Sequence, residues 1–269
     1  MAVKAKRRFG QNFLRDQAVI QAIVRCIHPL PTQTFVEIGP GQGALTALLL
    51  ERAGCLAAIE IDEDLLPVLR ERLEPKGLRL IAQDVLTVEF NWLASELQAS
   101  KLRVVGNLPY NISSPVLFHL LGFSDAIEDQ TFMLQEEVVD RMVASPGSKT
   151  YGRLSVMLQA KYDMEKCLYV PPESFWPVPK VQSAVVRMQP VASQRVVIKD
   201  WQVFGRLVAQ AFSSRRKMIR NTLGSLLDRL DLNAVGALPT QRPEELTVSQ
   251  YINLANQLID SNVTPLSPC

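Results

Sequence analysis

The chain has 269 residues, of which 47% are hydrophobic and 21% are charged, and its formal net charge is +2. This balance is typical of a soluble globular protein and excludes a disordered chain. The length accommodates one α/β domain of ordinary size and a smaller second domain. No apolar run approaches the roughly 18 residues that a membrane span needs, so we expect no membrane partner. The four cysteines lack the spacing of a metal site, and we expect no metal and a reduced, cytoplasmic location.

The first 14 residues, 1–14, are predicted to form an irregular N-terminal arm. The arm is basic at Lys6, Arg7 and Arg8, and it continues into polar residues where a signal peptide would need an apolar core. Beyond the arm, Asp16 is placed to cap a helix whose apolar residues recur at helical spacing.

Strand and helix patterns alternate from residue 35 to residue 140. Short apolar runs predict strands, and the amphipathic stretches between them predict helices. The expected strands cover 35–38, 56–61, 78–82, the segment around Val104, and 131–134. The expected helices cover 44–52 and 63–73, with further helices beginning near Ser113 and Glu136. This alternation predicts a mostly parallel, doubly wound α/β sheet, and we place its domain at 15–190.

The later part of the chain has a different pattern. Segment 152–160 predicts another helix, and 162–170 and 181–188 predict a late antiparallel pair of strands across a proline-rich loop. The composition changes near 189–194, which indicates a linker. Three apolar stripes at helical spacing then predict a small all-helical C-terminal domain over 195–269. The second stripe consists of Ile219, Leu223, Leu226 and Leu230.

A glycine-rich turn, Glu37-Ile38-Gly39-Pro40-Gly41-Gln42-Gly43, separates the first strand from its helix. Such a turn lets the backbone approach a ligand closely, unless the glycines serve only a tight turn. Glu60 ends the next strand, where an acid accepts hydrogen bonds from a ribose. Nicotinamide dinucleotides and S-adenosylmethionine both carry that ribose, but Glu37 disfavours a pyrophosphate and suits a cofactor with an ammonium group. Asp84 is placed to accept from the adenine amine of such a cofactor, or to act as an ordinary helix cap.

A second polar turn, Asn107-Leu108-Pro109-Tyr110, follows a buried strand. Open α/β sheets bind their ligands at the carboxyl ends of strands. The turn offers a side-chain amide oxygen, a backbone carbonyl and an aromatic ring, which are the groups that a planar base with an exocyclic amine needs. Phe175, in the proline-rich loop, is a second candidate ring for stacking on a base, with a role in the core as its alternative.

Several motifs occur together and in order. They are Gly10-Gln11-Asn12-Phe13-Leu14, the glycine-rich turn, Asn107-Leu108-Pro109-Tyr110 with Asn111-Ile112-Ser113, Phe175-x-Pro177-x-Pro179-Lys180, and Phe212-x-x-Arg215-Arg216-Lys217-x-x-Arg220-Asn221. Together they resemble the rRNA adenine dimethyltransferase family, and within it the bacterial small-subunit branch, which dimethylates two adjacent adenosines in the 3′-terminal hairpin. The resemblance extends from about residue 6 to about residue 225.

The resemblance implies a Rossmann-like class I S-adenosylmethionine-dependent methyltransferase. The residues implied to bind S-adenosylmethionine are Asn12, Leu14, Gly39, Gly41, Glu60, Asp84 and Asn107. The implied catalytic residues are Asn107, Leu108, Tyr110 and Phe175. The lone pair of an adenine N6 amine is delocalised into the ring. If the Asn107 side-chain oxygen and the Leu108 carbonyl accept from that amine, its lone pair can point at the sulfonium methyl group, so catalysis is mostly positioning.

RNA binding is expected from two basic clusters that contact phosphate without reading sequence. They contain Lys6, Arg7, Arg8, Arg215, Arg216, Lys217 and Arg220. With a net charge of only +2, a pre-assembled small ribosomal subunit is a more suitable substrate than naked rRNA, and an added role in subunit biogenesis is compatible with it. We expect a monomer, because no helix has a surplus apolar face.

Three alternatives remain open at this point. A nicotinamide oxidoreductase would explain the glycine turn and Glu60 but leaves Asn107–Tyr110 without a role. A non-catalytic RNA-binding or assembly factor on the same fold would not need the complete motif set. The large-subunit rRNA adenine methyltransferase that confers antibiotic resistance is the nearest rival, and the Gly10–Leu14 motif favours the small-subunit enzyme.

Overall fold

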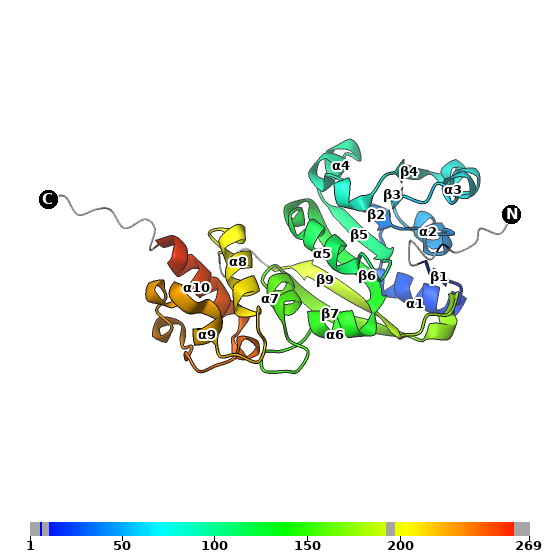
Figure 1. Ribbon diagram of the computed structural model, residues 1–269. Coiled ribbons are helices and arrows are strands. Elements are labelled where there is room, and N and C mark those ends of the chain that lie inside the picture. The colour runs from blue at the N-terminus through cyan, green and yellow to red at the C-terminus, as the bar shows by residue number, and fades with distance from the viewer. Residues whose placement is uncertain (1–5, 7–10, 192–196, 261–269) are drawn as a thin grey trace. The chain divides into compact units, whose positions relative to one another are not determined.

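The computed structural model describes residues 6, 11–191 and 197–260 (Figure 1). The chain divides into two compact units. The first consists of 1–139 with 164–190, and the second consists of 140–163 with 191–269. Each unit has its own core.

The first unit is built on a seven-stranded sheet with the strand order β4-β3-β2-β5-β6-β9-β7. Its strands are β2 (Thr34–Ile38), β3 (Cys55–Glu60), β4 (Leu78–Ala82), β5 (Leu102–Asn107), β6 (Ile127–Gln135), β7 (Tyr162–Val170) and β9 (Ser183–Pro190). The pairs among β2 to β6 are all parallel, and β9 runs antiparallel to β6. The prediction of a mostly parallel, doubly wound sheet is confirmed.

The strand order reverses beside β2, which has β3 on one side and β5 on the other. Both neighbours are parallel to β2, so the turns that follow these three strands lie at one edge of the sheet. Strands β2 and β5 are almost entirely buried, which is the pattern of central strands covered on both faces. A reversal of strand order at the carboxyl ends is where open α/β sheets bind ligands.

Helices cover both faces of this sheet (Figure 1). They are α1 (Gln17–Ile27), α2 (Ala44–Leu50), α3 (Leu66–Leu73), α4 (Phe90–Glu96) and α5 (Ser113–Leu121), followed by α6 (Glu136–Met142) after β6. Residues of α1, α2 and α3 share one hydrophobic core with the sheet. Helix α1 begins as predicted, because the Asp16 side chain accepts from the backbone N–H groups of Ala18 and Val19.

A two-stranded antiparallel sheet joins β1 (Phe13–Leu14) to β8 (Phe175–Trp176). Its register pairs Phe13 with Trp176 and Leu14 with Phe175. The prediction of an irregular arm is therefore wrong at its last two residues. A strand of two residues has no periodicity to detect, and its partner lies far away in the sequence. The arm segments 1–5 and 7–10 lie outside the described residues.

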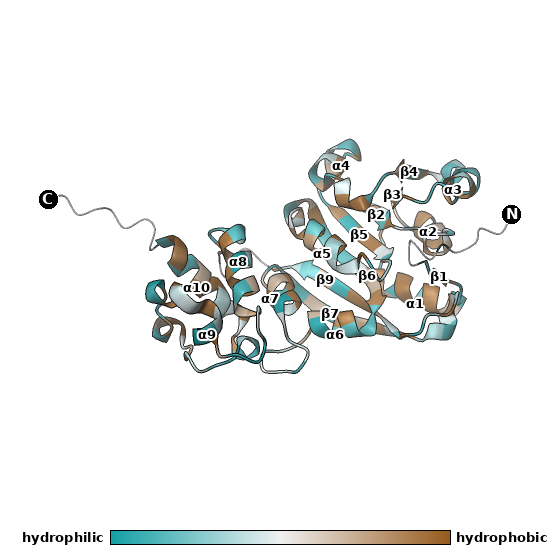
Figure 2. Cartoon of the chain, viewed as in Figure 1, coloured by the Kyte–Doolittle hydropathy of each residue, from teal (hydrophilic) through white to brown (hydrophobic). Residues whose placement is uncertain are grey.

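The second unit is helical, as predicted for the C-terminal part of the chain. Its helices are α7 (Arg153–Gln159), α8 (Trp201–Ala211), α9 (Ile219–Leu223) and α10 (Val248–Asp260). Figure 2 shows hydrophobic and hydrophilic bands alternating along α8. Four hydrophobic residues of α8 are buried, namely Phe204, Leu207, Val208 and Ala211, whereas Trp201 at its start is exposed.

The expected boundary of the helical domain differs from the observed one. Segment 140–163 belongs to the helical unit, whereas the sequence placed it in the sheet domain. Helix α7 contacts α8 and α10, and the Gln159 side-chain amide donates to the carbonyls of Met142 and Ala144 at 2.8 Å each. Linear order does not reveal that an internal helix packs with later ones.

The second apolar stripe of the sequence does not form one α-helix. Helix α9 ends at Leu223, and a 3-10 helix, Gly224–Arg229, follows it. Gly224 has φ +55° and ψ −128°, a conformation with positive φ that glycine adopts without a steric penalty and that interrupts the α-helix. The predicted continuation through Leu226 and Leu230 is therefore wrong.

Candidate active site

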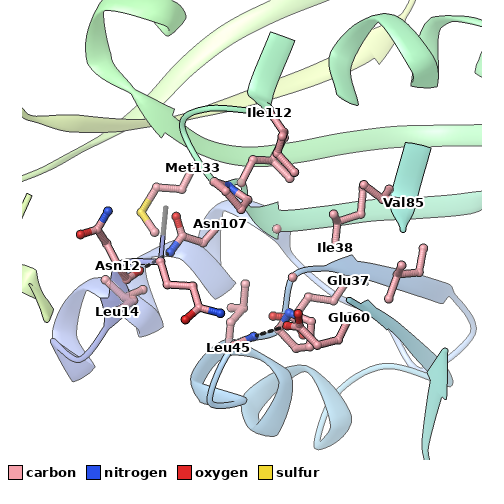
Figure 3. A pocket seen from close by; sticks show the side chains of 18 of the residues that line it. Asn12, Leu14, Glu37, Ile38, Leu45, Glu60, Val85, Asn107, Ile112 and Met133 are labelled. Carbon is pink, nitrogen blue, oxygen red and sulfur yellow. Dashed lines mark hydrogen bonds between the residues drawn. The ribbon is translucent and has the colours of Figure 1, made fainter. Parts of the chain in front are cut away.

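A cavity of about 280 Å³ lies at the carboxyl ends of β2, β3 and β5 (Figure 3). It is lined by every residue predicted to bind the cofactor and by three residues of the predicted catalytic set. The predicted residues that line it are Asn12, Leu14, Gly39, Gly41, Glu60, Asp84, Asn107, Leu108 and Tyr110. The fold therefore assembles one site from residues that are separated by up to a hundred positions in the sequence.

The glycine-rich turn forms one wall of the cavity. Gly39 and Gly41 have φ values of +65° and +58°, in the left-handed region that favours glycine. A Cβ atom at Gly41 would also lie 3.1 Å from the Phe13 ring, which packs over the turn. The turn thus needs glycine for its backbone conformation and, at Gly41, for the close approach of Phe13.

Glu60 is fixed at the end of β3 by backbone donors. Its Oε1 accepts from the Asp62 N–H at 2.9 Å, and its Oε2 accepts from the Gly41 N–H at 3.4 Å. Burial raises the pKa of Glu60, against these two hydrogen bonds, which lower it. A carboxylate held in this way beside the cavity is placed to accept hydrogen bonds from ribose hydroxyls.

Glu37 lies next to Glu60 at the bottom of the glycine turn (Figure 3). Its side chain is buried, and burial raises its pKa to about 7. Among the described residues, no group hydrogen-bonds to its Oε2 atom. A buried acceptor without a protein partner in a cavity fits a ligand that brings a cationic donor, such as the ammonium group of S-adenosylmethionine. It does not suit a pyrophosphate.

Asp84 lines the cavity, and the helix-cap interpretation also applies to it. Its Oδ1 accepts from the Leu86 N–H at 3.0 Å, at the start of the 3-10 helix Val85–Thr87. The cap fixes the position of this side chain beside the cavity.

Asn107 ends β5, and its orientation is set by the N-terminal arm. Its Nδ2 donates to the backbone carbonyl of Asn12 at 3.0 Å. Because the amide nitrogen is engaged in this way, the Oδ1 atom is the one that faces other ligands as an acceptor. No pattern in the sequence relates the Asn12 carbonyl to the Asn107 amide, so the sequence predicted both residues but not the contact between them.

The residues after Asn107 form a tightly held turn. The Leu108 N–H donates to the Met133 carbonyl at 3.2 Å, and Leu108 is fully buried. The Ile112 N–H donates to the Pro109 carbonyl at 3.1 Å and leads directly into α5. Such a fixed backbone keeps its groups in place without reorganisation, which is what catalysis by positioning requires.

The two predicted aromatic residues differ in position. The Tyr110 hydroxyl lies 2.8 Å from the Ser183 Oγ, its ring lines the cavity, and burial raises its pKa. Phe175 is only 2% exposed, belongs to the hydrophobic core and is not among the residues that line the cavity. The β1–β8 pairing places it opposite Leu14, which supports the core interpretation, and its stacking role stays a prediction.

Two of the predicted RNA-binding side chains are engaged within the protein. The Lys6 ammonium lies 2.5 Å from Asp62 Oδ1 and 2.5 Å from Asp64 Oδ2. The Arg215 guanidinium donates to the carbonyls of Lys149 and Tyr151, the latter at 2.9 Å. These contacts compete with phosphate for both side chains, and their RNA-binding role stays a prediction.

The other basic residues fall into two groups. Arg216, Lys217 and Arg220 are exposed on the segment that joins α8 to α9 and on the first turn of α9. Arg7 and Arg8 lie outside the described residues. Within the described part of the chain, no group of three or more histidine, cysteine or acidic side chains is arranged for a metal ion. In the same part, no helix is long and apolar enough to cross a bilayer.

Known proteins resemble this chain over nearly its whole length. The family model described as "Ribosomal RNA adenine dimethylase" matches residues 2–260. Ribosomal RNA small subunit methyltransferase A of Bordetella avium is 50% identical over 260 residues, which cover 97% of each chain. The protein of the same name in Burkholderia cenocepacia is 52% identical over 258 residues, which cover 94% of each chain.

Two solved structures have the same fold. A dimethyladenosine transferase from Plasmodium falciparum matches with a TM-score of 0.78 and 22% identity, covering 93% of this chain and 98% of that one. The 23S rRNA methyltransferase ErmE matches with a TM-score of 0.72 and 26% identity, covering 92% of this chain and 100% of that one.

The parallel sheet, the glycine-rich turn and the polar turn that begins at Asn107 together define a class I methyltransferase that uses S-adenosylmethionine. More particularly, the chain belongs to the ribosomal RNA adenine dimethylase family. The nicotinamide oxidoreductase is thereby excluded as an alternative, and the motif-based resemblance is confirmed.

Proposed function

We propose that this enzyme transfers methyl groups from S-adenosylmethionine to the N6 amines of two adjacent adenosines in the 3′-terminal hairpin of small-subunit rRNA, giving N6,N6-dimethyladenosine. The relatives that are 50% and 52% identical bear the name of a small-subunit methyltransferase, whereas ErmE, named for 23S rRNA, is 26% identical. This difference favours the small-subunit substrate over the large-subunit rival.

The observation that carries the proposed chemistry is the hydrogen bond from Asn107 Nδ2 to the Asn12 carbonyl. It leaves the Asn107 Oδ1 atom to accept from the adenine N6 amine, together with the Leu108 carbonyl. Two acceptors on one amine draw the nitrogen toward tetrahedral geometry and free its lone pair for attack. When bound, the cofactor supplies an electrophilic methyl group on a sulfonium. The proton leaves the alkylated nitrogen for solvent, so no strong general base is required.

The target base must leave its stack to enter the cavity, and an aromatic face offsets part of that energy. Tyr110 lines the cavity and is held by Ser183, so we assign it this stacking role. A second methylation requires the same acceptors to hold a monomethylated amine, which has one donor fewer.

We assign the RNA contacts to Arg216, Lys217 and Arg220 of the helical unit. These side chains are exposed and lie on one short segment, which suits contact with successive phosphates. A net charge of +2 supports only moderate affinity for naked RNA, so a pre-assembled small subunit is the proposed substrate. An added role in subunit biogenesis, a monomeric state and action in the cytoplasm complete the proposal.

The test is methyl transfer from labelled S-adenosylmethionine to unmethylated small subunits, with large subunits and naked rRNA compared in parallel. Digestion to nucleosides should recover the label as N6,N6-dimethyladenosine from the small subunits. Label on the large subunits would assign the enzyme to the resistance class instead. Cofactor binding with no transfer to any RNA would support the alternative of a non-catalytic assembly factor.

A further inference from the structure

We propose that Asp62 is a positioning residue for methyl transfer. It fixes the arm at Gln11 and Asn12 against the cofactor cavity, and through the Asn12 carbonyl it orients the Asn107 amide. The inference rests on the proposed catalytic role of Asn107, and it adds a residue that the motifs of the sequence do not include.

The Asp62 carboxylate is buried and accepts from the arm with both of its oxygens. Its Oδ2 accepts from the Gln11 side-chain amide at 2.7 Å, and its Oδ1 accepts from the Lys6 ammonium at 2.5 Å. The Lys6 backbone N–H in turn donates to the Gln11 Oε1 at 2.9 Å. The Gln11 amide is therefore fixed at both ends, with its donor on Asp62 and its acceptor on Lys6.

Asp62 also contacts the cofactor wall. Its backbone N–H donates to Glu60 Oε1 at 2.9 Å, while Glu60 Oε2 accepts from the glycine turn. Asp62 thus connects Glu60, the acid assigned to the ribose, with the arm at Gln11. Gln11 and Asn12 both line this cavity.

The next link in the chain of contacts is covalent. Gln11 is followed directly by Asn12, whose carbonyl accepts from Asn107 Nδ2 at 3.0 Å. Phe13 and Leu14 then pair with β8, so the segment is held on its C-terminal side by a strand and on its N-terminal side by Asp62. Loss of the Asp62 side chain removes the acceptor that holds Gln11, the residue directly before Asn12.

Asp64 provides a matched control. It also pairs with Lys6 at 2.5 Å, but its side chain is 62% exposed, against 1% for Asp62. An exposed ion pair contributes little, whereas a buried carboxylate with several donors contributes much more. If the arm were held merely by attraction between Lys6 and acids, loss of either carboxylate would have similar effects.

The first experiment compares the full-length Asp62→Ala and Asp64→Ala variants. Calorimetry measures the Kd of S-adenosylhomocysteine without any RNA, and single-turnover kinetics measure transfer to small subunits. For Asp62→Ala we expect affinity to fall on the order of tenfold, which is the loss of one charged hydrogen bond, and a slower transfer step at saturating cofactor. Asp64→Ala should match the wild type in both. Wild-type affinity in Asp62→Ala would overturn the proposal, and this readout does not depend on which RNA is the substrate.

The second experiment reverses the hydrogen bond, so that it does not depend on the folding of an alanine variant. Gln11→Glu places two carboxylates against each other and should weaken S-adenosylhomocysteine binding. Adding Asp62→Asn restores a donor–acceptor pair with the roles exchanged and should recover most of the affinity. A double variant at least as weak as Gln11→Glu alone would contradict a direct role of this contact.

Discussion

At the scale of single residues, Glu37 makes cofactor binding depend on pH. Its pKa is raised to about 7 by burial, and an ammonium group binds the ionised carboxylate more strongly than the neutral acid. The affinity for S-adenosylhomocysteine should therefore increase as the pH rises through 7 and then level off. Calorimetry on both sides of this value measures the effect. Glu37→Gln should bind more weakly with no such step, and a step that persists in this variant would assign the titration to another group.

The raised pKa of Glu37 also affects the free energy of unfolding, which should fall as the pH rises, whereas cofactor affinity increases. Its pKa is about 7 in the folded protein against an ordinary value of 4.5, so between these values the folded state keeps a proton that the unfolded state has lost. The unfolding free energy of the cofactor-free protein should fall by up to about 1.4 kcal/mol per pH unit in this window. Urea titrations should show a smaller fall for Glu37→Gln. Equal slopes in the two proteins would contradict the raised pKa.

Nine residues that line the cavity could be predicted from the sequence, but their contacts could not. Gly39, Gly41 and Glu60 follow a local pattern that the turn geometry requires. The bond between Asn107 and Asn12 joins segments 95 positions apart, and no local pattern encodes it. The burial of Phe175 could not be predicted for a related reason, because it depends on the pairing of β8 with β1.

At the scale of elements, a buried ionic network stabilises the sheet. Asp129 of β6 accepts from Arg103 of β5 at 2.7 Å through both of its oxygens and from Arg187 of β9 at 3.0 Å. Asp129→Ala leaves the Arg103 guanidinium, 3% exposed, without its counter-ion, which should lower the unfolding free energy by about 3–5 kcal/mol.

Urea denaturation measures this loss, and the exposed neighbour Glu128 provides the control. Glu128→Ala should change the unfolding free energy by less than about 0.5 kcal/mol. Similar losses in the two variants would show that the network contributes nothing specific to the stability of the sheet.

The elements themselves were predicted best where a long local signal exists. Strand β4 and strand β7 have the predicted bounds, because an apolar or alternating run with turns on both sides defines them. Strands β1 and β8 were missed, since two residues are too few for a period. Helix α4 was also missed. Helix α9 ends early at Gly224, whose positive φ is a property of the backbone rather than of the apolar stripe.

At the scale of the whole molecule, the exposed cations of the helical unit should determine the salt dependence of RNA binding. Replacing Arg216, Lys217 and Arg220 by alanine should weaken rRNA binding and reduce the slope of log K against log salt by roughly 0.7–0.9 for each lost phosphate contact. Fluorescence titrations over a range of salt measure the slope. Arg215→Ala is the control, because the Arg215 guanidinium donates to the carbonyls of Lys149 and Tyr151 within the unit. This variant should lower the free energy of unfolding, with little change in the slope of log K against log salt. An unchanged slope in the triple variant would place the RNA elsewhere.

Fold class and family could be predicted for the whole chain because several spaced motifs agree with the strand–helix alternation. The division into units could be predicted only in part. Segment 140–163 lies between two stretches of the sheet domain in the sequence, but it packs with the later helices. Such packing depends on contacts between apolar faces that are far apart in the sequence. The local period of apolar residues predicts a helix but not the helix it packs against.

In the proposed mechanism, Asn107 accepts from the target amine with its side-chain oxygen. The most direct measurement is single-turnover methyl transfer to small subunits by Asn107→Ala, with S-adenosylhomocysteine affinity measured on the same preparation. At saturating cofactor we predict a transfer rate lower on the order of 10²–10³-fold, as for the loss of one oriented hydrogen-bonding group in an active site, and a much smaller loss of cofactor affinity from the contact of Asn107 with the cofactor. An unchanged transfer rate, or a loss fully explained by weaker cofactor binding, would contradict the account.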